Sequence, residues 1–271
     1  MRRQRGVFVL VSTVLFVGLV PGSVPPLFAQ GWGNLKVRFV YGGQAPMPQP
    51  LQITKDQAFC GKFDVVDESR VVDPQTKGLA NVVGFLYVSR TDPKKPSIHP
   101  SYDELKNKPV KLDNDKCRFS PHVAVVWTEQ VLELGNSDEV AHNTNIATLN
   151  PANPPINQLI PAQKSIEHRF KQPENLPIPV ACNIHPWMKG YVVVRDNPYA
   201  AVSNEKGELV IENIPAGEWK FRFWQEAVGY VSKVEVNGKP TTWTRGEVTV
   251  RITDGQTTDL GTVVVPASAF K

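Results

Sequence analysis

Short runs of alternating apolar and polar residues follow one another along most of the chain. Clear examples are the runs LKVRFVYGG at 35–43, LANVVGFLYVSR at 79–90 and HVAVVWTEQVLELGNSD at 122–138. A period of two with β-branched and aromatic residues is typical of strands, and Gly, Pro, Asn and Asp between the runs mark turns. Only the run 101–108 offers one or two helical turns. The pattern predicts an all-β fold built from sandwiches.

Changes in this pattern divide the chain into four parts. Residues 1–30 differ from all the rest, and 31–110 are strand-rich, as a separate sandwich or an extension of the next domain. Residues 111–196 form the part that carries the candidate chemistry, and 197–271 alternate cleanly around the turns NEKG and IPAGE. About 75 residues suffice for a small antiparallel sandwich, although such a domain is marginal alone.

The first thirty residues have the layout of a secretory signal peptide. MRRQR precedes the apolar run GVFVLVSTVLFVGLV, and PGSVPPLFAQ then places helix breakers and a small residue before a cut near Ala29 or Gln30. The apolar run is short for a membrane span, so a retained anchor is the less favoured alternative. We expect an exported protein, in the periplasm, on the cell surface or outside the cell, with no membrane span in the mature chain.

Removal of this leader changes the charge balance. The full chain has 30 Lys and Arg against 26 Asp and Glu, and the leader takes three Arg and no acid, which leaves a net charge near +1. No run rich in Lys and Arg with interleaved aromatic residues remains, so nucleic acid is not an expected partner.

The three cysteines predict one disulfide and one free thiol. Export permits disulfides, and Cys60 and Cys117 both lie in polar, turn-like contexts, so we expect these two to pair and Cys182 to remain free. The alternative is a pair of buried, reduced thiols. A free cysteine in an oxidising compartment needs a reason, and metal ligation is one.

Cys182 belongs to a short loop that holds three potential metal ligands. In the run CNIHPWM, residues Cys182, His185 and Met188 are three apart, and His142 lies forty residues upstream at the end of a strand. A thiolate, two imidazoles and a weak thioether are the donors of a type 1 copper site. Zinc accepts a thioether poorly, and the second cysteine of a haem or thioredoxin motif is missing. The alternative is a buried small Cys and a Met that fills the core.

The motifs HN at 142–143 and CNIHPWMKGYVVV at 182–194 resemble those of the cupredoxins, and the short loop looks most like that of the amicyanins. The resemblance covers about residues 112–196 and implies a Greek-key β-sandwich with one copper ion. It also implies the copper ligands His142, Cys182, His185 and Met188. Two features depart from the family pattern: a longer, proline-rich segment before Cys182, and Val180 where many members have an aromatic residue.

The same resemblance implies roles around the ligands. Asn143 would tie the two ligand loops together, and the exposed edge at Pro186 and Trp187 would be the docking site of a redox partner protein. Packing of Trp187 against the following strand is the alternative. For His122, in SPHVAVV, a structural role is favoured over ligation.

The C-terminal part resembles carboxypeptidase regulatory-like and transthyretin-like sandwiches, on the run from Gly207 to Trp219. Such modules are usually not catalytic. Trp219, Trp224 and Trp243 offer a candidate carbohydrate platform, with core packing as the favoured role for at least two of them. Cupredoxin plus regulatory-like modules also occur together in proteins labelled "methylamine utilization protein".

Two hypotheses about function follow. The first is an exported type 1 copper protein that transfers single electrons and is not an enzyme, because no Ser/His/Asp set, carboxylate pair in a cleft or phosphate loop is evident. The alternative is a cell-envelope binding or structural protein without redox activity, which engages glycans or proteins through the same sandwiches.

Overall fold

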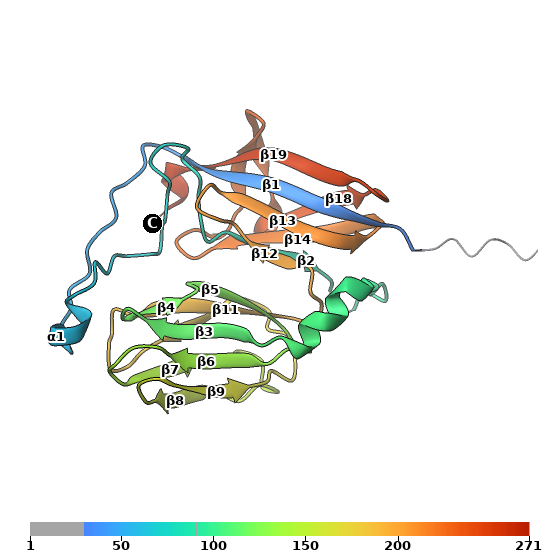
Figure 1. Ribbon diagram of the computed structural model, residues 1–271. Coiled ribbons are helices and arrows are strands. Elements are labelled where there is room, and N and C mark those ends of the chain that lie inside the picture. The colour runs from blue at the N-terminus through green and yellow to red at the C-terminus, as the bar shows by residue number, and fades with distance from the viewer. Residues whose placement is uncertain (1–29, 90, 271) are drawn as a thin grey trace, which may run out of the picture.

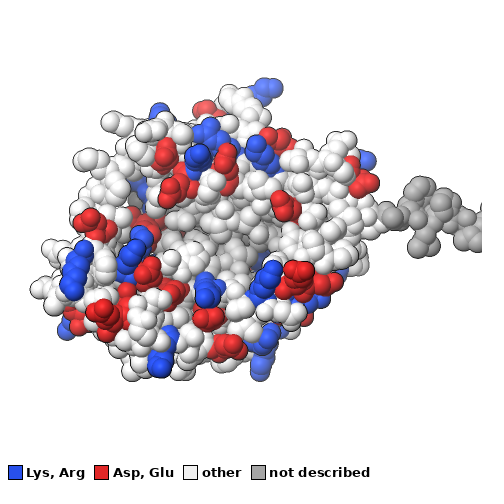
Figure 2. All heavy atoms as spheres, viewed as in Figure 1, with Lys and Arg blue, Asp and Glu red and all other residues white. Residues whose placement is uncertain are grey.

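The computed structural model describes residues 30–89 and 91–270, so the predicted signal peptide lies, apart from its last residue, outside the described residues. Figure 1 shows a molecule made of strands stacked in layers, with few and short helical turns. The predicted all-β fold class is confirmed. None of the described helices is long and apolar enough to cross a membrane. On the face in Figure 2, acidic and basic side chains are interspersed.

The first sandwich, which we call the site sandwich, spans residues 110–195 and consists of two sheets. Its core contains the apolar side chains of both inner faces, with Leu112, Phe119 and Ile178 among the buried residues. One sheet has the order β5 (Val123–Trp127), β11 (Lys189–Arg195), β10 (Ile178–Ala181), β7 (His142–Ile146) and β8 (Ile156–Ile160). The other has the order β4 (Arg118–Ser120), β3 (Val110–Asp115), β6 (Leu132–Asn136) and β9 (Lys164–His168).

The second sandwich, the companion sandwich, combines strands from both ends of the described chain. Its core combines aliphatic and aromatic side chains, with Phe39, Phe221 and Phe223 fully buried. One sheet has the order β13 (Glu208–Pro215), β1 (Trp32–Gly42), β19 (Thr257–Pro266), β16 (Lys233–Val236) and β17 (Lys239–Thr242). The other has the order β12 (Ala200–Val202), β2 (Val83–Tyr87), β14 (Gly217–Gln225) and β15 (Gly229–Tyr230), and β18 (Glu247–Ile252) pairs with β14.

This arrangement corrects the expected division of the chain. Residues 31–110 were predicted as a separate sandwich or an extension of the cupredoxin-like sheet, and 197–271 as a sandwich of their own. Instead β1 lies between β13 and β19, and β2 lies between β12 and β14. The C-terminal strands thereby pair with β1 and β2, which also extend the hydrophobic core. A module of about 75 residues buries a smaller share of its surface and is only marginally stable alone.

The expected carbohydrate platform is also not present as an exposed surface. Trp219, Trp224 and Trp243 are only 6%, 8% and 5% exposed. Trp219 and Trp243 pack in the core of the companion sandwich, and Trp224 packs between the two sandwiches. Because period-two alternation points Trp219 inward, its apolar ring is removed from water together with Phe221 and Phe223.

The two sandwiches pack through a small apolar interface. Val83, Phe85 and Trp224 of the companion sandwich form a buried cluster with Val123 and Val193 of the site sandwich. This interface explains why the run Val192 to Val194 is buried at every position and does not alternate. A strand covered on both faces carries apolar residues on both.

Between β1 and β2 the chain leaves the companion sandwich and runs to one end of the site sandwich, where α1 (Gln57–Cys60) lies (Figure 1). We call residues 51–65 the cap segment. Its two ends are joined by a hydrogen bond from the Leu51 N–H to the Val65 carbonyl, 2.9 Å long. A disulfide joins Cys60 to Cys117, as the sequence predicts, and leaves Cys182 as the free cysteine. The remaining short helices are 3₁₀ turns at Pro100–Asn107, Thr244–Gly246 and Ala267–Ala269.

His122, in the site sandwich, lies beside carboxylates from two other parts of the chain. Its Nε2 lies 3.0 Å from Glu226 Oε2 of the companion sandwich, and its Nδ1 lies 3.7 Å from Glu68 Oε2 on the connection after the cap segment. Burial lowers the pKa of His122, but the hydrogen bond to Glu226 and the two carboxylate charges outweigh it and raise the pKa to about 9. His122 is therefore a buried cation that holds the two sandwiches together, in line with a structural role.

Stability should fall when His122 loses its proton. A folded-state pKa of about 9 exceeds the ordinary 6.5, so the stabilisation is complete below pH 6.5 and is lost as the pH rises through 9. We expect the free energy of unfolding to drop by at most about 3 kcal/mol over this window. Denaturant unfolding at pH 6 and at pH 9 measures this difference in the free energy of unfolding. In His122→Gln this part of the pH dependence should vanish, and an equal pH dependence in both proteins would contradict the assignment.

Loss of the disulfide should destabilise the metal-free protein. The bridge closes a sequence separation of 57 residues, for which loop-closure entropy gives about 4 kcal/mol. We expect Cys60→Ser/Cys117→Ser to unfold at correspondingly lower denaturant. The wild-type protein treated with a thiol reductant is the matched control and should behave like the variant. Unchanged unfolding in both would show that the bridge contributes nothing.

Candidate metal centre

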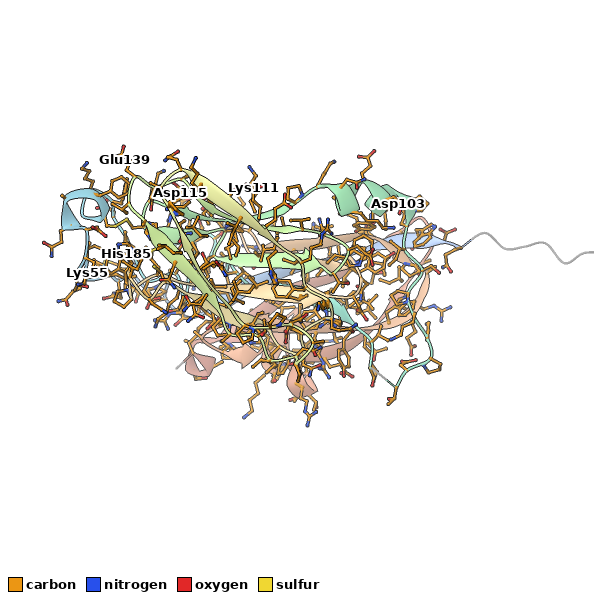
Figure 3. All side chains as sticks on the ribbon, turned by 90° about the horizontal axis from the view of Figure 1, so that it is seen from below. Lys55, Asp103, Lys111, Asp115, Glu139 and His185 are labelled. Carbon is orange, nitrogen blue, oxygen red and sulfur yellow. A yellow bond between two sulfur atoms is a disulfide. The ribbon has the colours of Figure 1, made fainter. Side chains whose placement is uncertain are left out.

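Two neighbouring strands bring the predicted ligands to one end of the site sandwich. His142 is the first residue of β7, and Cys182 follows β10 directly. The two strands pair antiparallel, with Ala181 opposite Asn145, so the start of β7 lies beside the loop that leaves β10. His185 and Met188 belong to that loop, which ends where β11 begins. Figure 3 shows His185 at this end, close to α1 and Lys55.

Three donor atoms converge in the interior. Cys182 Sγ lies 3.9 Å from His142 Nδ1 and 3.7 Å from His185 Nδ1, and the two imidazole centroids are 4.4 Å apart. All three ligand atoms lie within 4.8 Å of one another. Both histidines are fully buried and Cys182 is 2% exposed. The three side chains therefore face a common point that water does not reach.

These separations match a metal site. A metal about 2.0 to 2.1 Å from nitrogen and about 2.3 Å from sulfur holds the two atoms roughly 3.5 to 3.8 Å apart at tetrahedral or trigonal angles. The observed 3.7 Å falls in this range and the observed 3.9 Å lies about 0.1 Å above it. A second group of candidate ligands consists of Cys117, Asp138 and His142. Cys117 is part of the disulfide, so it has no thiolate to offer.

A carboxylate holds the outer nitrogen of each imidazole. His142 Nε2 lies 2.8 Å from Asp138 Oδ2, and His185 Nε2 lies 2.7 Å from Asp56 Oδ2. Asp138 also accepts the backbone N–H groups of Lys116 and Cys117. An ionised carboxylate only accepts hydrogen bonds, so a neutral ring bonded in this way has its proton on Nε2 and its Nδ1 lone pair directed at Cys182.

Burial and neighbouring groups shift the pKa values of the three candidate ligands in different directions. Burial raises the pKa of the Cys182 thiol, but its contacts with His142 and with backbone N–H groups more than offset this, so that its pKa lies below the usual value. Burial lowers the pKa of His142, and its bonds to Asp138 and Cys182 bring it above the usual value. For His185, burial and the charge of His142 outweigh Asp56, and the pKa is lowered.

Backbone hydrogen bonds close the loop around the cysteine. The His185 N–H points at Cys182 Sγ at 3.4 Å, the Met188 N–H donates to the His185 carbonyl at 2.9 Å, and the Cys182 N–H donates to the Met188 carbonyl at 3.3 Å. Met188 is 1% exposed and packs in the core that also contains Cys182. The turn thus places the predicted fourth ligand in the same buried cluster.

Asn143 joins the two ligand loops, the role that the resemblance implies. Its Oδ1 accepts the backbone N–H of Asn183 at 2.7 Å and that of Ile184 at 3.3 Å, and it lies 3.5 Å from Cys182 Sγ. Its Nδ2 donates to Asn157 Oδ1 at 2.8 Å. One side chain on β7 therefore fixes the backbone of the loop after β10.

The predicted docking edge at Pro186 and Trp187 lies beside the cap segment. Pro186 is exposed and Trp187 is half-buried. The ring of the neighbouring His185, in contrast, is fully buried. Asp56 covers its outer nitrogen, and the Trp187 Nε1–H donates to the Cys117 carbonyl at 3.1 Å. Trp187 is thereby tied to the disulfide-linked part of the chain, and the cap segment covers the outer nitrogen of His185.

Asp56 and Asp138 were missed from the sequence. Asp138 lies four residues before His142 in the turn between β6 and β7, so a local signal existed. Asp56 lies 129 residues before His185, and nothing in the sequence near either residue links them.

Comparisons with known proteins find cupredoxins among the solved structures. No family model matches the chain, and no curated protein matches it in sequence. A mutant of amicyanin in its oxidized state is 17% identical over 38% of this chain and 95% of its own, with a TM-score of 0.30. A purple cupredoxin from Nitrosopumilus maritimus is 21% identical over 32% of this chain and 98% of its own, with a TM-score of 0.26.

A copper-containing nitrite reductase from Thermus scotoductus SA-01 is 18% identical over 41% of this chain, with a TM-score of 0.29, and the chain spans only 25% of that protein's length. The similar structures are cupredoxins or contain copper by their descriptions. Because the identities and TM-scores are low, the assignment of the centre rests on the residues of this chain.

Removal of the Asn143 side chain should loosen the ligand loop. Asn143→Ala leaves the N–H groups of Asn183 and Ile184 without their acceptor, at a cost of about 1–3 kcal/mol in unfolding free energy. The buried Cys182 thiol of the metal-free protein should then react faster with a thiol reagent. Asn157→Ala is the matched control, because it removes a partner of Asn143 but leaves these acceptor bonds in place. Equal thiol reactivity in both variants would contradict this role.

Proposed function

We propose that the chain is a type 1 copper protein that transfers single electrons, with His142, Cys182, His185 and Met188 as ligands. The observation that carries the proposal is the convergence of two imidazole Nδ1 atoms on one buried cysteine sulfur, at 3.9 and 3.7 Å. A trigonal set of two histidines and a cysteine, with a weak axial thioether, is the donor arrangement of blue copper proteins.

Copper suits this donor set better than zinc. A structural zinc site has four strong ligands, usually cysteine and histidine. Here the carboxylates near the cluster are engaged with the outer imidazole nitrogens, and the fourth candidate in the loop is the thioether of Met188. A soft thiolate and a thioether favour Cu(I), and the imidazoles also suit Cu(II).

Copper, when bound, supplies the one-electron chemistry. The protein contributes a fixed set of ligands. Asp138 and Asp56 orient the imidazoles, Asn143 holds the loop of Cys182, and burial excludes water from the donor atoms. Ligands that keep their positions in both oxidation states reduce the reorganisation that accompanies electron transfer. The proposal requires no substrate chemistry from this chain, which would act as a carrier and not as an enzyme.

Export and a redox partner complete the proposal. The disulfide between Cys60 and Cys117 is stable in an oxidising compartment, which supports a location in the periplasm or outside the cell. A carrier of single electrons needs a donor and an acceptor, so we expect at least one protein partner.

Copper reconstitution tests this function. We expect the purified mature chain, loaded with Cu(II), to show an intense copper–thiolate absorption band and the EPR spectrum of a type 1 site, both absent in Cys182→Ser. Asn183→Ser, at the exposed neighbouring position, should keep the band. A wild-type protein that stays colourless and binds no copper would refute the proposal and favour the binding or structural alternative.

A further inference from the structure

The cap segment, which is not part of the site sandwich, supplies the carboxylate of Asp56 that binds the candidate ligand His185. Asp56 comes from the connection between β1 and β2, which otherwise belong to the companion sandwich. Its Oδ2 lies 2.7 Å from His185 Nε2, and the imidazole beneath it is fully buried while the Asp56 side chain is 44% exposed. The carboxylate therefore sits between the ring and solvent, on the edge of the histidine that would otherwise face outward.

The local structure at Asp56 is unfavourable for the cap segment itself. Asp56 precedes α1 with φ 45° and ψ 41°, in the left-handed region, which costs an L-residue on the order of 1 kcal/mol. An aspartate at this position normally caps the helix with its side chain, which is worth about 1 kcal/mol, yet the Asp56 side chain makes no such bond. Asp56 therefore has neither a relaxed backbone conformation nor a capping hydrogen bond while its carboxylate points at His185. Backbone strain of this kind is concentrated at functional sites.

The cap segment is anchored so that Asp56 stays in place. The disulfide fixes Cys60, four residues after Asp56, to the β3–β4 hairpin of the site sandwich. The N–H groups of Phe59 and Cys60 both donate to the Asp56 carbonyl, at 2.9 and 2.8 Å. Ile53, Phe59 and Phe63 pack against the core that contains Cys182. These contacts restrict the backbone of the segment independently of the Asp56–His185 bond.

We propose that Asp56 is a positioning residue of the metal centre, which holds His185 as the Nε2–H tautomer with Nδ1 aimed at Cys182. The inference rests on the proposed function. The cap segment thereby assembles the third donor before any metal arrives and closes the outer edge of the ring. With Asp138 on His142, each imidazole of the centre has its own carboxylate. Partners of this kind typically contribute roughly 10- to 100-fold to metal affinity.

The test uses two variants and one control. Asp56→Ala removes the acceptor, and Asp56→Asn keeps an oxygen acceptor but removes the charge. Asp64→Ala is the matched control, because Asp64 is an exposed carboxylate on the same segment. The first readout is the tautomer of His185 in the metal-free full chain at pH 7, from long-range proton–nitrogen NMR. We expect Nε2–H in the wild type, in Asp56→Asn and in Asp64→Ala, and loss of that preference in Asp56→Ala.

The second readout is Cu(II) affinity, from competition with a chelator. We expect Asp56→Ala to bind roughly 10- to 100-fold more weakly than the wild type, Asp56→Asn to lose less, and Asp64→Ala to match the wild type. An unchanged tautomer in Asp56→Ala, or an affinity loss no larger than in Asp64→Ala, would overturn the role of Asp56. If the wild type binds no copper, the proposed function fails, and the tautomer of the metal-free protein still decides whether Asp56 positions His185.

Discussion

The centre depends on one constraint: two imidazole nitrogens must face the same buried sulfur. Cys182 Sγ lies 3.7 and 3.9 Å from the two Nδ1 atoms, and these atoms can bind a metal only while each ring has its proton on the opposite nitrogen. Asp138 and Asp56 impose that choice from two different parts of the chain. A mobile ring or the other tautomer would direct an N–H at the cysteine and leave the metal without a donor.

The two sandwiches have different parts in this arrangement. The site sandwich contributes the donors, because β7 and β10 pair antiparallel and bring His142 beside the loop of Cys182. The companion sandwich holds both ends of the connection that carries Asp56, since β1 and β2 each lie inside one of its sheets. The ion pair of His122 with Glu226 and the disulfide then fix the two bodies to each other and the cap segment to the site.

Local patterns were enough to predict the fold class and to single out His142, Cys182 and His185, which the structure brings together. Alternating runs predicted strands, and the spacing of Cys182, His185 and Met188 predicted a turn that folds them inward, with His142 as the upstream partner. Counting three cysteines predicted the disulfide. The sequence could not predict contacts made by distant segments. The parallel pairing of β1 with β19, which absorbs the N-terminal strands into the companion sandwich, joins residues more than 200 positions apart, and Asp56 reaches His185 only through that arrangement.

X-ray absorption at the copper edge of the loaded protein tests the central claim most directly. It reads the atoms bound to the metal without reference to colour or activity. The arrangement of Cys182 between two Nδ1 atoms predicts a first shell with one short copper–sulfur distance and two imidazole nitrogens. A shell of oxygen and nitrogen atoms without sulfur would contradict it, because copper would then be bound elsewhere on the protein.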